Sequence, residues 1–342
     1  MVRRTAAVAA LALSSLAACA DAPVSADGAT SPGSLNLSKS GNGKSGDNVP
    51  EVKTAKTNKK EPGSVDRGRY NITFRYVVPT SPERQAVFEA AAARWEKIII
   101  GDEPSVTGTL PTQLCGGGAP AFTGTIDDVL IDVILTNIDG RGRILGSAGP
   151  CFANANNLTL HGTMRFDIAD LPTLEARGTF DEVIVHEMGH VLGVGTLWNF
   201  RRALRIGTNT PNVAFVGEKA ITGYNSVGGA KIPVPVENMF GPGTQNAHWR
   251  ESTFDNELMT GFLNGSLANP RENPLSRVTA GSMRDLGYRS AMPAEQYKLP
   301  EASQIRGSAN SSNGANLADT EIDFNVSEEL LEVQATVQRA DP

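Results

Sequence analysis

Two histidines and one glutamate lie within five consecutive residues near the middle of the chain. His186 and His190 are four residues apart, and Glu187 directly follows the first, in an H-E-x-x-H pattern. Residues four apart lie one turn apart on the same face of a helix, so both imidazoles can bind one metal ion. The chain has only four histidines, and this spacing rarely arises by chance. We therefore predict a zinc site here.

A zinc ion at this position would form a hydrolytic centre. Zinc lowers the pKa of its water to about 7, and Glu187 is close enough to take the proton as that water attacks a peptide carbonyl. The same carboxyl group can later deliver the proton to the leaving amine. These residues predict an enzyme, a zinc metalloendopeptidase, with Glu187 as its general base.

A catalytic zinc usually has three protein ligands, and the helix provides only two. Thermolysin-like enzymes take a glutamate from a later helix, for which the candidates are Glu218, Glu237 and Glu257. Metzincins turn at a glycine three residues after the second histidine and place a third histidine three residues beyond it. Gly193 is present, but Thr196 occupies the position of that third histidine.

Further along, the sequence resembles the leishmanolysin family of metzincins. In that family an insertion separates the glycine from the third histidine, and the methionine of the Met-turn lies in a Glu-Leu-Met run shortly after it. Here His248 is followed by Met259 in such a run. The similarity covers about residues 70 to 290, includes segments 88–96 and 282–288, and is greatest to bacterial members.

The resemblance implies roles for five residues of this chain. His186, His190 and His248 would bind one zinc ion, Met259 would lie beneath it as an apolar floor, and Gly193 would end the helix. The general base would again be the glutamate of the H-E-x-x-H pattern.

One position departs from the pattern of some metzincins, which have a tyrosine two residues after the methionine. That position is Gly261, so the group that stabilises the oxyanion is open. Tyr224 and Tyr288 are candidates, although packing roles suit them better. His161 could lie near a substrate cleft, but a hydrogen-bonding role within a strand is the simpler interpretation.

The N-terminus has the layout of a secretory signal. Arg3 and Arg4 precede an apolar stretch that ends in Leu-Ala-Ala-Cys at Cys19, which resembles a bacterial lipobox. An ordinary cleavage site with a chance cysteine is the alternative. We expect an exported lipoprotein of the cell envelope, in the outer membrane or at the cell surface, and whether it is also released is open. The rival function is a non-catalytic zinc-containing surface adhesin or binding lipoprotein.

Composition divides the chain into four parts. Residues 1–19 are the signal peptide, 20–66 a polar and flexible linker, 67–300 the catalytic domain, and 301–342 a polar acidic tail. Strands are expected at 72–76, 129–135 and 159–168, and helices at 82–99 and from 180 onward, after a capping box of Thr179 and Glu182. We predict an α+β, metzincin-like fold: a twisted mixed sheet with two main helices in an N-subdomain (67–195), and a loop-rich C-subdomain (196–300).

Charge and cysteine content restrict the partners. The net charge of −6 gives no electrostatic support for nucleic-acid binding, so protein or peptide substrates are expected, with membrane contact through the lipid alone. Once Cys19 is lipidated, Cys115 and Cys151 remain. Both lie in Gly/Pro-rich turns on either side of the strand at 129–135, and we predict a disulfide between them. The sequence does not decide whether calcium binds.

Overall fold

A computed structural model describes most of the chain between residues 68 and 301. The described ranges are 68–112, 118–142, 144–200, 202–241, 243–263, 273–291 and 294–301, with the backbone of 51–54, 322–323 and 338–339. All of them belong to one compact unit, Lys44–Pro342. The predicted signal peptide and Cys19 lie outside the described residues.

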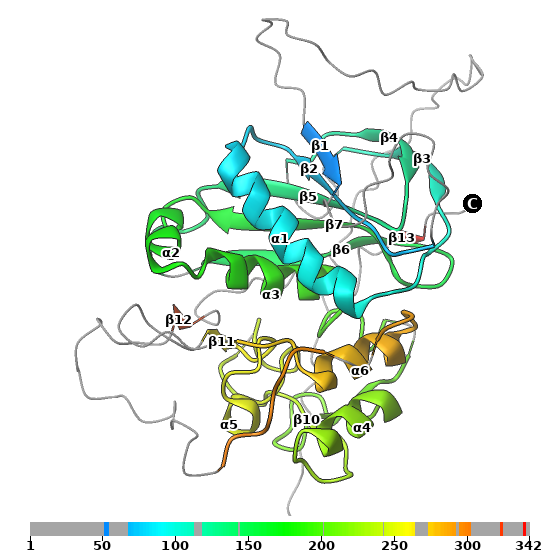
Figure 1. Ribbon diagram of the computed structural model, residues 1–342, viewed down its shortest axis with the longest axis vertical. Coiled ribbons are helices and arrows are strands. Elements are labelled where there is room, and N and C mark those ends of the chain that lie inside the picture. The colour runs from blue at the N-terminus through cyan, green and yellow to red at the C-terminus, as the bar shows by residue number, and fades with distance from the viewer. Residues whose placement is uncertain are drawn as a thin grey trace, which may run out of the picture. The chain divides into compact units, whose positions relative to one another are not determined.

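Strands mainly from the first part of the described chain form a six-stranded mixed sheet (Figure 1). Its order is β1 (Glu51–Thr54), β2 (Ile72–Tyr76), β5 (Val129–Thr136), β7 (Thr159–Asp167), β6 (Gly146–Ala153) and β13 (Gln338–Arg339). Strands β2, β5 and β7 are parallel, and β13 is parallel to β6. Strands β1 and β6 run antiparallel to their neighbours β2 and β7. The expected mixed sheet is present.

The side chains explain why the central strands form. The first six residues of β5 are buried, as its continuous apolar and β-branched run predicts. In β2, the aromatic and aliphatic side chains of Ile72, Phe74 and Tyr76 alternate with polar ones and join the main hydrophobic core. Phe88 of the first helix lies edge-on against Phe74, with ring centroids 5.7 Å apart.

Two helices pack against the same hydrophobic core. Helix α1 (Pro82–Ile98) begins where the Ser81 side chain accepts a hydrogen bond from the Arg84 backbone N–H at 3.4 Å, as predicted. Helix α3 (Phe180–Leu192) contacts α1, β6 and β7, and both helices are labelled in Figure 1. Trp95 of α1 donates its indole N–H to the Val185 carbonyl of α3 at 2.8 Å, which fixes the two helices to each other.

The later part of the chain contains short elements joined by long loops. Helices α4 (Glu218–Ser226) and α6 (Arg277–Leu286) pack together, because glycines allow their backbones to meet. A Cβ atom at Gly281 would lie 2.4 Å from the Lys219 carbonyl oxygen. The remaining elements here are α5 (Glu251–Phe254), β8 (Arg205–Ile206), β9 (Ala214–Phe215) and β10 (Val234–Pro235).

With α2 (Leu171–Arg177), the described residues contain six helices and a mixed sheet. The protein is thus of mixed α/β composition, consistent with the predicted α+β class. Strands β3 (Val106–Leu110) and β4 (Phe122–Ile126) form a hairpin, and β11 (Phe262–Leu263) pairs with β12 (Ile322–Asp323). In the described part of the chain, no helix combines the length and apolar character needed to cross a membrane.

Three short strands lie in segments that the sequence analysis assigned to linker and tail. Strand β1 falls within the expected linker, and β12 and β13 fall within the expected tail. Their composition gave no sign of this, because a strand at the edge of a sheet pairs through its backbone and needs little apolar surface. The other residues of the linker, and those of the tail beyond residue 301, lie outside the described residues.

The two predicted subdomains are joined near the end of α1. The Ile100 N–H donates to the Arg289 carbonyl at 2.9 Å, and the Ala291 N–H donates to the Ile98 carbonyl at 2.7 Å. The later half therefore returns to the sheet that carries α3, and both halves contribute to the site.

Candidate metal centre

Helix α3 positions two histidines and ends abruptly after them. Gly193 follows its last residue with φ 115°, a left-handed conformation that favours glycine. The Gly193 and Val194 N–H groups both donate to the Gly189 carbonyl, at 3.0 and 2.9 Å. This turn places the Val194 carbonyl 2.9 Å from Nδ1 of His190, so the turn that ends the helix also orients a histidine.

The start of α3 is where predicted, but the predicted capping box is wrong. The Thr179 side chain makes no capping hydrogen bond. The Glu182 carboxylate instead accepts from the backbone N–H and side-chain amide of Asn273, at 3.3 and 2.6 Å. A tertiary contact with the later half of the chain thus replaces the local one.

A loop from the later half brings His248 to this helix. Gly195, at φ 74°, lets it approach, because a Cβ atom there would lie 2.1 Å from the Ala247 carbonyl oxygen. Nδ1 of His248 lies 3.1 Å from the Thr244 carbonyl oxygen. The Glu237 N–H donates to the carbonyl of His248 at 2.9 Å. Backbone contacts on both sides therefore hold the residue in place.

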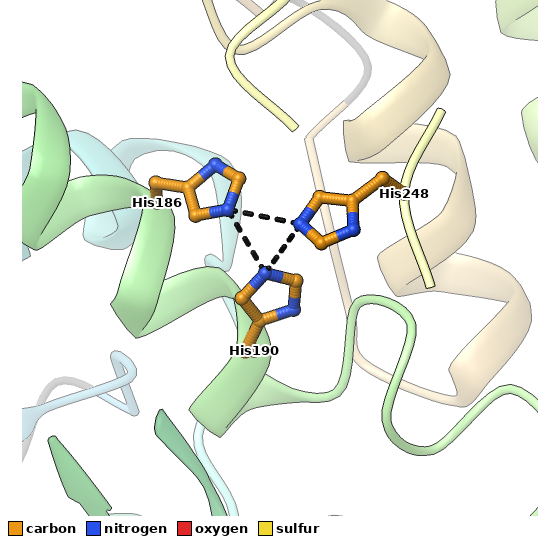
Figure 2. Close-up of side chains that lie close together, drawn as sticks. All are labelled: His186, His190 and His248. Atoms are coloured by element: carbon orange, nitrogen blue, oxygen red, sulfur yellow. Dashed lines mark hydrogen bonds between the residues drawn. The ribbon is translucent and has the colours of Figure 1, made fainter. Parts of the chain in front are cut away.

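The three histidine rings meet at one point (Figure 2). Nε2 of His186 lies 3.0 Å from Nε2 of His190 and 3.1 Å from Nε2 of His248, and the last two atoms are 3.0 Å apart. All three residues are completely buried. The structure therefore brings together the three histidines that the resemblance implied, two from α3 and one from a loop.

Each of these rings has a backbone carbonyl beside its other nitrogen. For His186 the acceptor is the Leu258 carbonyl, 2.7 Å from Nδ1. A carbonyl oxygen only accepts hydrogen bonds, so the hydrogen of each neutral ring lies on Nδ1 and its Nε2 lone pair points toward the other two rings.

This donor set can hold a metal ion. Nitrogens bound tetrahedrally at about 2.0–2.1 Å from zinc lie roughly 3.3–3.4 Å apart, slightly farther than the separations found here. Imidazole nitrogens suit zinc, copper, iron or nickel. Backbone acceptors behind each ring are the arrangement that fixes tautomer and orientation in metal sites. The residues present thus fit a metal bound by three histidines.

The three glutamates considered as alternative ligands have other places. Glu218 is exposed in the first turn of α4. The Glu237 carboxylate accepts from the backbone N–H groups of Met239 and Glu251 at 3.0 and 2.9 Å. Glu257 accepts from the backbone N–H of Met259 at 2.7 Å. None of the three belongs to the group that can hold the ion.

Met259 lies between the helix and the loop. It is fully buried, and a Cβ atom at Gly189 would lie 2.7 Å from both its Sδ and Cε atoms. Its carbonyl accepts from the Trp249 N–H at 2.9 Å, next to His248. The glycine inside the H-E-x-x-H pattern therefore makes room for the methionine against the helix.

Glu257 holds the turn that contains this methionine. Besides its bond to the turn, the carboxylate accepts from the Ser276 N–H at 2.9 Å and from the Thr279 hydroxyl at 2.5 Å. Burial raises the pKa of Glu257, and these hydrogen bonds oppose the rise. The carboxylate ties the turn to the beginning of α6.

The general base predicted from the sequence, Glu187, is also fully buried on α3. Its carboxyl group lies against the first residue of β6, because a Cβ atom at Gly146 would lie 2.8 Å from Oε1 of Glu187. The carboxyl group of Glu187 is therefore enclosed between the helix and the sheet.

The two candidate tyrosines have packing roles. Tyr288 lies edge-on against Tyr70, with ring centroids 5.7 Å apart, and Tyr224 lies beside Phe254 at 5.4 Å. No tyrosine fits at Gly261 either, because a Cβ atom there would lie 2.5 Å from Cγ2 of Thr244.

His161 lies on the face of the sheet away from α3. Its neighbour Gly162 faces helix α3, because a Cβ atom at Gly162 would lie 2.5 Å from Cγ1 of Val191. Successive residues of a strand face opposite sides of the sheet, so His161 faces the other side. Nε2 of His161 lies 3.0 Å from Asp132, which also forms an ion pair with Arg75. Burial opposes ionisation, but these two partners hold the pKa of Asp132 below its ordinary value. His161 is thus a hydrogen-bonding strand residue.

A second group of carboxylates lies near the end of α1. Oxygen atoms of Asp102, Asp127 and Asp128 lie within 4.8 Å of one another. Asp128 is buried and accepts from the backbone N–H groups of Asn71 and Glu103, at 2.8 and 2.5 Å. Burial raises the pKa of Asp128 to about 7. These bonds join the strands β2 and β5 to the chain that follows α1.

Of the three cysteines, only Cys151 is described. It is buried in β6 and disulfide-bonded. Its predicted partner Cys115 and the predicted lipid-bearing Cys19 both lie outside the described residues.

The features missed by the sequence analysis are the three carbonyl acceptors and the glycines of close approach. Every residue has a backbone carbonyl, so residue types do not indicate which carbonyl accepts a hydrogen bond. The glycines could have been noticed, because Gly146 and Gly189 occur where a strand and a helix would favour other residues.

No protein-family model and no curated protein matches this chain.

Proposed function

We propose that this protein is a zinc-dependent endopeptidase of the metzincin type, similar to leishmanolysin. The observation that carries the proposal is the meeting of three Nε2 atoms from His186, His190 and His248, within 3.0–3.1 Å of one another. Three histidines with one position left open are a ligand set of catalytic rather than structural zinc.

The residues divide the chemistry between them. The histidines would hold the ion, a Lewis acid that would lower the pKa of its bound water to about 7. Glu187 accepts the proton of the attacking water and returns it to the amine of the cleaved peptide. Its burial favours this role, because a carboxylate away from bulk water is a stronger base than an exposed one.

The metzincin assignment rests on two further contacts. The glycine turn at Gly193 orients His190 through Val194, and Met259 lies fully buried against the helix at Gly189. A thermolysin-type site would need a glutamate among the ligands instead.

We also propose that the protein is exported and anchored through Cys19. The disulfide at Cys151 supports export, because disulfides persist in oxidising compartments. In cells, the wild-type protein should fractionate with membranes, and Cys19→Ser should change its processing or release it. A soluble wild-type protein with an unmodified Cys19 would contradict the anchor.

The test of function uses the purified protein and an unfolded protein as substrate. A chelator should abolish cleavage, and added zinc should restore it while added magnesium should not. Cleavage that persists after the metal has been removed would contradict the proposal. A protein that binds zinc but cleaves nothing would favour the rival, a non-catalytic adhesin or binding lipoprotein.

A further inference from the structure

The first residue of β6 lies directly against the proposed general base. A Cβ atom at Gly146 would lie 2.8 Å from Oε1 and 3.0 Å from Cδ of Glu187, and 3.1 Å from the Arg165 carbonyl oxygen. A Cβ atom essentially never lies within 3.0 Å of an atom of another residue, so one of the two groups would have to shift. The smallest possible side chain at position 146 would therefore compete with the carboxyl group for the same space.

The backbone conformation gives no other reason for a glycine here. Gly146 is not among the residues with positive φ, whereas Gly193 is. Alanine could adopt the conformation of Gly146, and strands disfavour glycine unless another group approaches closely. The group that approaches here is the carboxyl of Glu187.

We infer that Gly146 is a positioning residue, whose missing side chain determines where the Glu187 carboxylate lies. The inference rests on the proposed function, in which that carboxylate is the base. It adds a residue about 40 positions earlier in the chain to the requirements of the reaction.

The surroundings decide which group would yield to a side chain at this position. Strand β6 is paired with β7, with Gly146 opposite Phe166, and the Asp167 N–H donates to the Leu145 carbonyl at 3.1 Å. Helix α3 is held by Trp95 through the Val185 carbonyl. The Glu187 side chain has three rotatable bonds, whereas the strand and the helix are held by backbone hydrogen bonds. It should move before the backbone does.

Such a movement would affect catalysis more than stability. A misplacement of about 1 Å can cost about a hundredfold in rate. The metal ligands themselves would keep their positions, because their ring nitrogens are held by carbonyls elsewhere. We expect Gly146→Ala to lower kcat roughly 10- to 100-fold while KM and the zinc content per chain stay within about twofold.

Two other glycines of the strands provide matched controls. Gly108 of β3 has no atom within 4 Å of a Cβ position, so Gly108→Ala should leave kcat unchanged. A Cβ atom at Gly162 of β7 would press on Val191 of the same helix, 2.5 Å away, and on the Gly149 carbonyl oxygen of β6, 2.8 Å away, without touching the base. Gly162→Ala should lower the Tm by several degrees but reduce kcat less than Gly146→Ala does.

A shorter base should relieve the conflict. In Glu187→Asp the carboxyl group ends one methylene earlier, so Gly146→Ala should reduce kcat less than about threefold in that background. The same loss in both backgrounds would overturn the inference, because it would show an effect that does not pass through the carboxylate. If Gly146→Ala alone does not fold, recovery of the fold in the double variant supports the contact, and its failure contradicts it.

Crystal structures of the wild type and Gly146→Ala provide a measurement that needs no activity. The carboxylate of Glu187 should lie away from β6 in the variant, with the three histidines superimposed. An unmoved carboxylate would overturn the inference. If the wild-type protein cleaves no peptide, the proposed function fails, and the position of the carboxylate still decides this inference.

Discussion

Nδ1 of His186 donates a hydrogen bond to the backbone carbonyl of Leu258, 72 residues later in the chain, at 2.7 Å. This bond joins the helix of the H-E-x-x-H pattern to the turn that contains Met259. The Met259 carbonyl in the same turn accepts a hydrogen bond at 2.9 Å from the N–H of Trp249, the residue that follows His248. His186 is therefore oriented by the later half of the chain, and the cluster of three histidines forms only when both halves are folded together.

Removal of His248 should distinguish a site with three histidine ligands from a site with two histidines and a glutamate. His248→Ala removes one of three ligands, and we expect at least about a hundredfold weaker zinc binding, because the loss of a mere hydrogen-bond partner of a ligand already costs 10- to 100-fold. Glu218→Ala is the control, since that side chain is exposed and away from the site. Zinc titration with a chromophoric chelator measures both variants. Unchanged affinity in His248→Ala would contradict the ligand set.

Gly189→Ala should destabilise the protein although alanine favours a helix. The helix preference is worth about 0.8–1 kcal/mol, but the added carbon would lie 2.7 Å from Met259 and 2.9 Å from Trp95. Overpacking of this kind costs about 1–3 kcal/mol, so we expect a net loss of up to about 2 kcal/mol in urea unfolding. Met259→Ala should relieve part of that loss, so the two changes should not be additive. A more stable Gly189→Ala would show that the contact is easily relaxed.

Glu182 should make stability depend on pH. Burial raises the pKa of Glu182 to about 7 from an ordinary value of 4.5, against the hydrogen bonds from Asn273. The folded state therefore binds the proton more tightly than the unfolded state does. The resulting stabilisation is complete below about pH 4.5 and is lost as the pH rises to about 7.

Glu182→Gln removes this titration. Between pH 4.5 and 7, the unfolding free energy of the variant should therefore fall less than that of the wild type, and the difference between the two falls should be on the order of 1–3 kcal/mol. Asp128 titrates in the same range but is present in both proteins and cancels in the difference. Unfolding in the presence of a chelator excludes competition between protons and metal. Parallel curves for wild type and variant would contradict the shifted pKa.

The disulfide at Cys151 should be structural. Its sulfur is buried in β6, and on the entropic model a loop of about 36 residues closed with Cys115 stabilises the fold by roughly 3–4 kcal/mol. Cys151→Ser should lower the unfolding free energy by about that amount. Peptide mapping of the unreduced protein should recover Cys115 joined to Cys151. A free thiol at position 115 would contradict the predicted pairing.

Much of the fold and two of the three clustered histidines follow from local patterns. The buried run of β5, the Ser81 cap of α1 and the Gly193 turn are each properties of a few neighbouring residues, and the structure has them as expected. His186 and His190 share a helical face because of their spacing alone.

The rest depends on contacts between distant segments, which no local pattern encodes. His248 could be placed only through a resemblance, because 58 residues separate it from His190. Thr179 carries a capping signal that goes unused, since Glu182 finds Asn273 instead. Strand β1 forms through its backbone from a segment that reads as linker.

The most direct test of the central claim is the rate at which zinc-loaded Glu187→Gln cleaves an unfolded protein, measured together with its zinc content. Glutamine has the same shape as glutamate but cannot accept the proton, and the histidines remain in place. We predict one zinc ion per chain, as in the wild type, and a kcat lower by about 10²–10⁴-fold. Cleavage at the wild-type rate, with zinc bound, would contradict the role of Glu187 and with it the proposed mechanism.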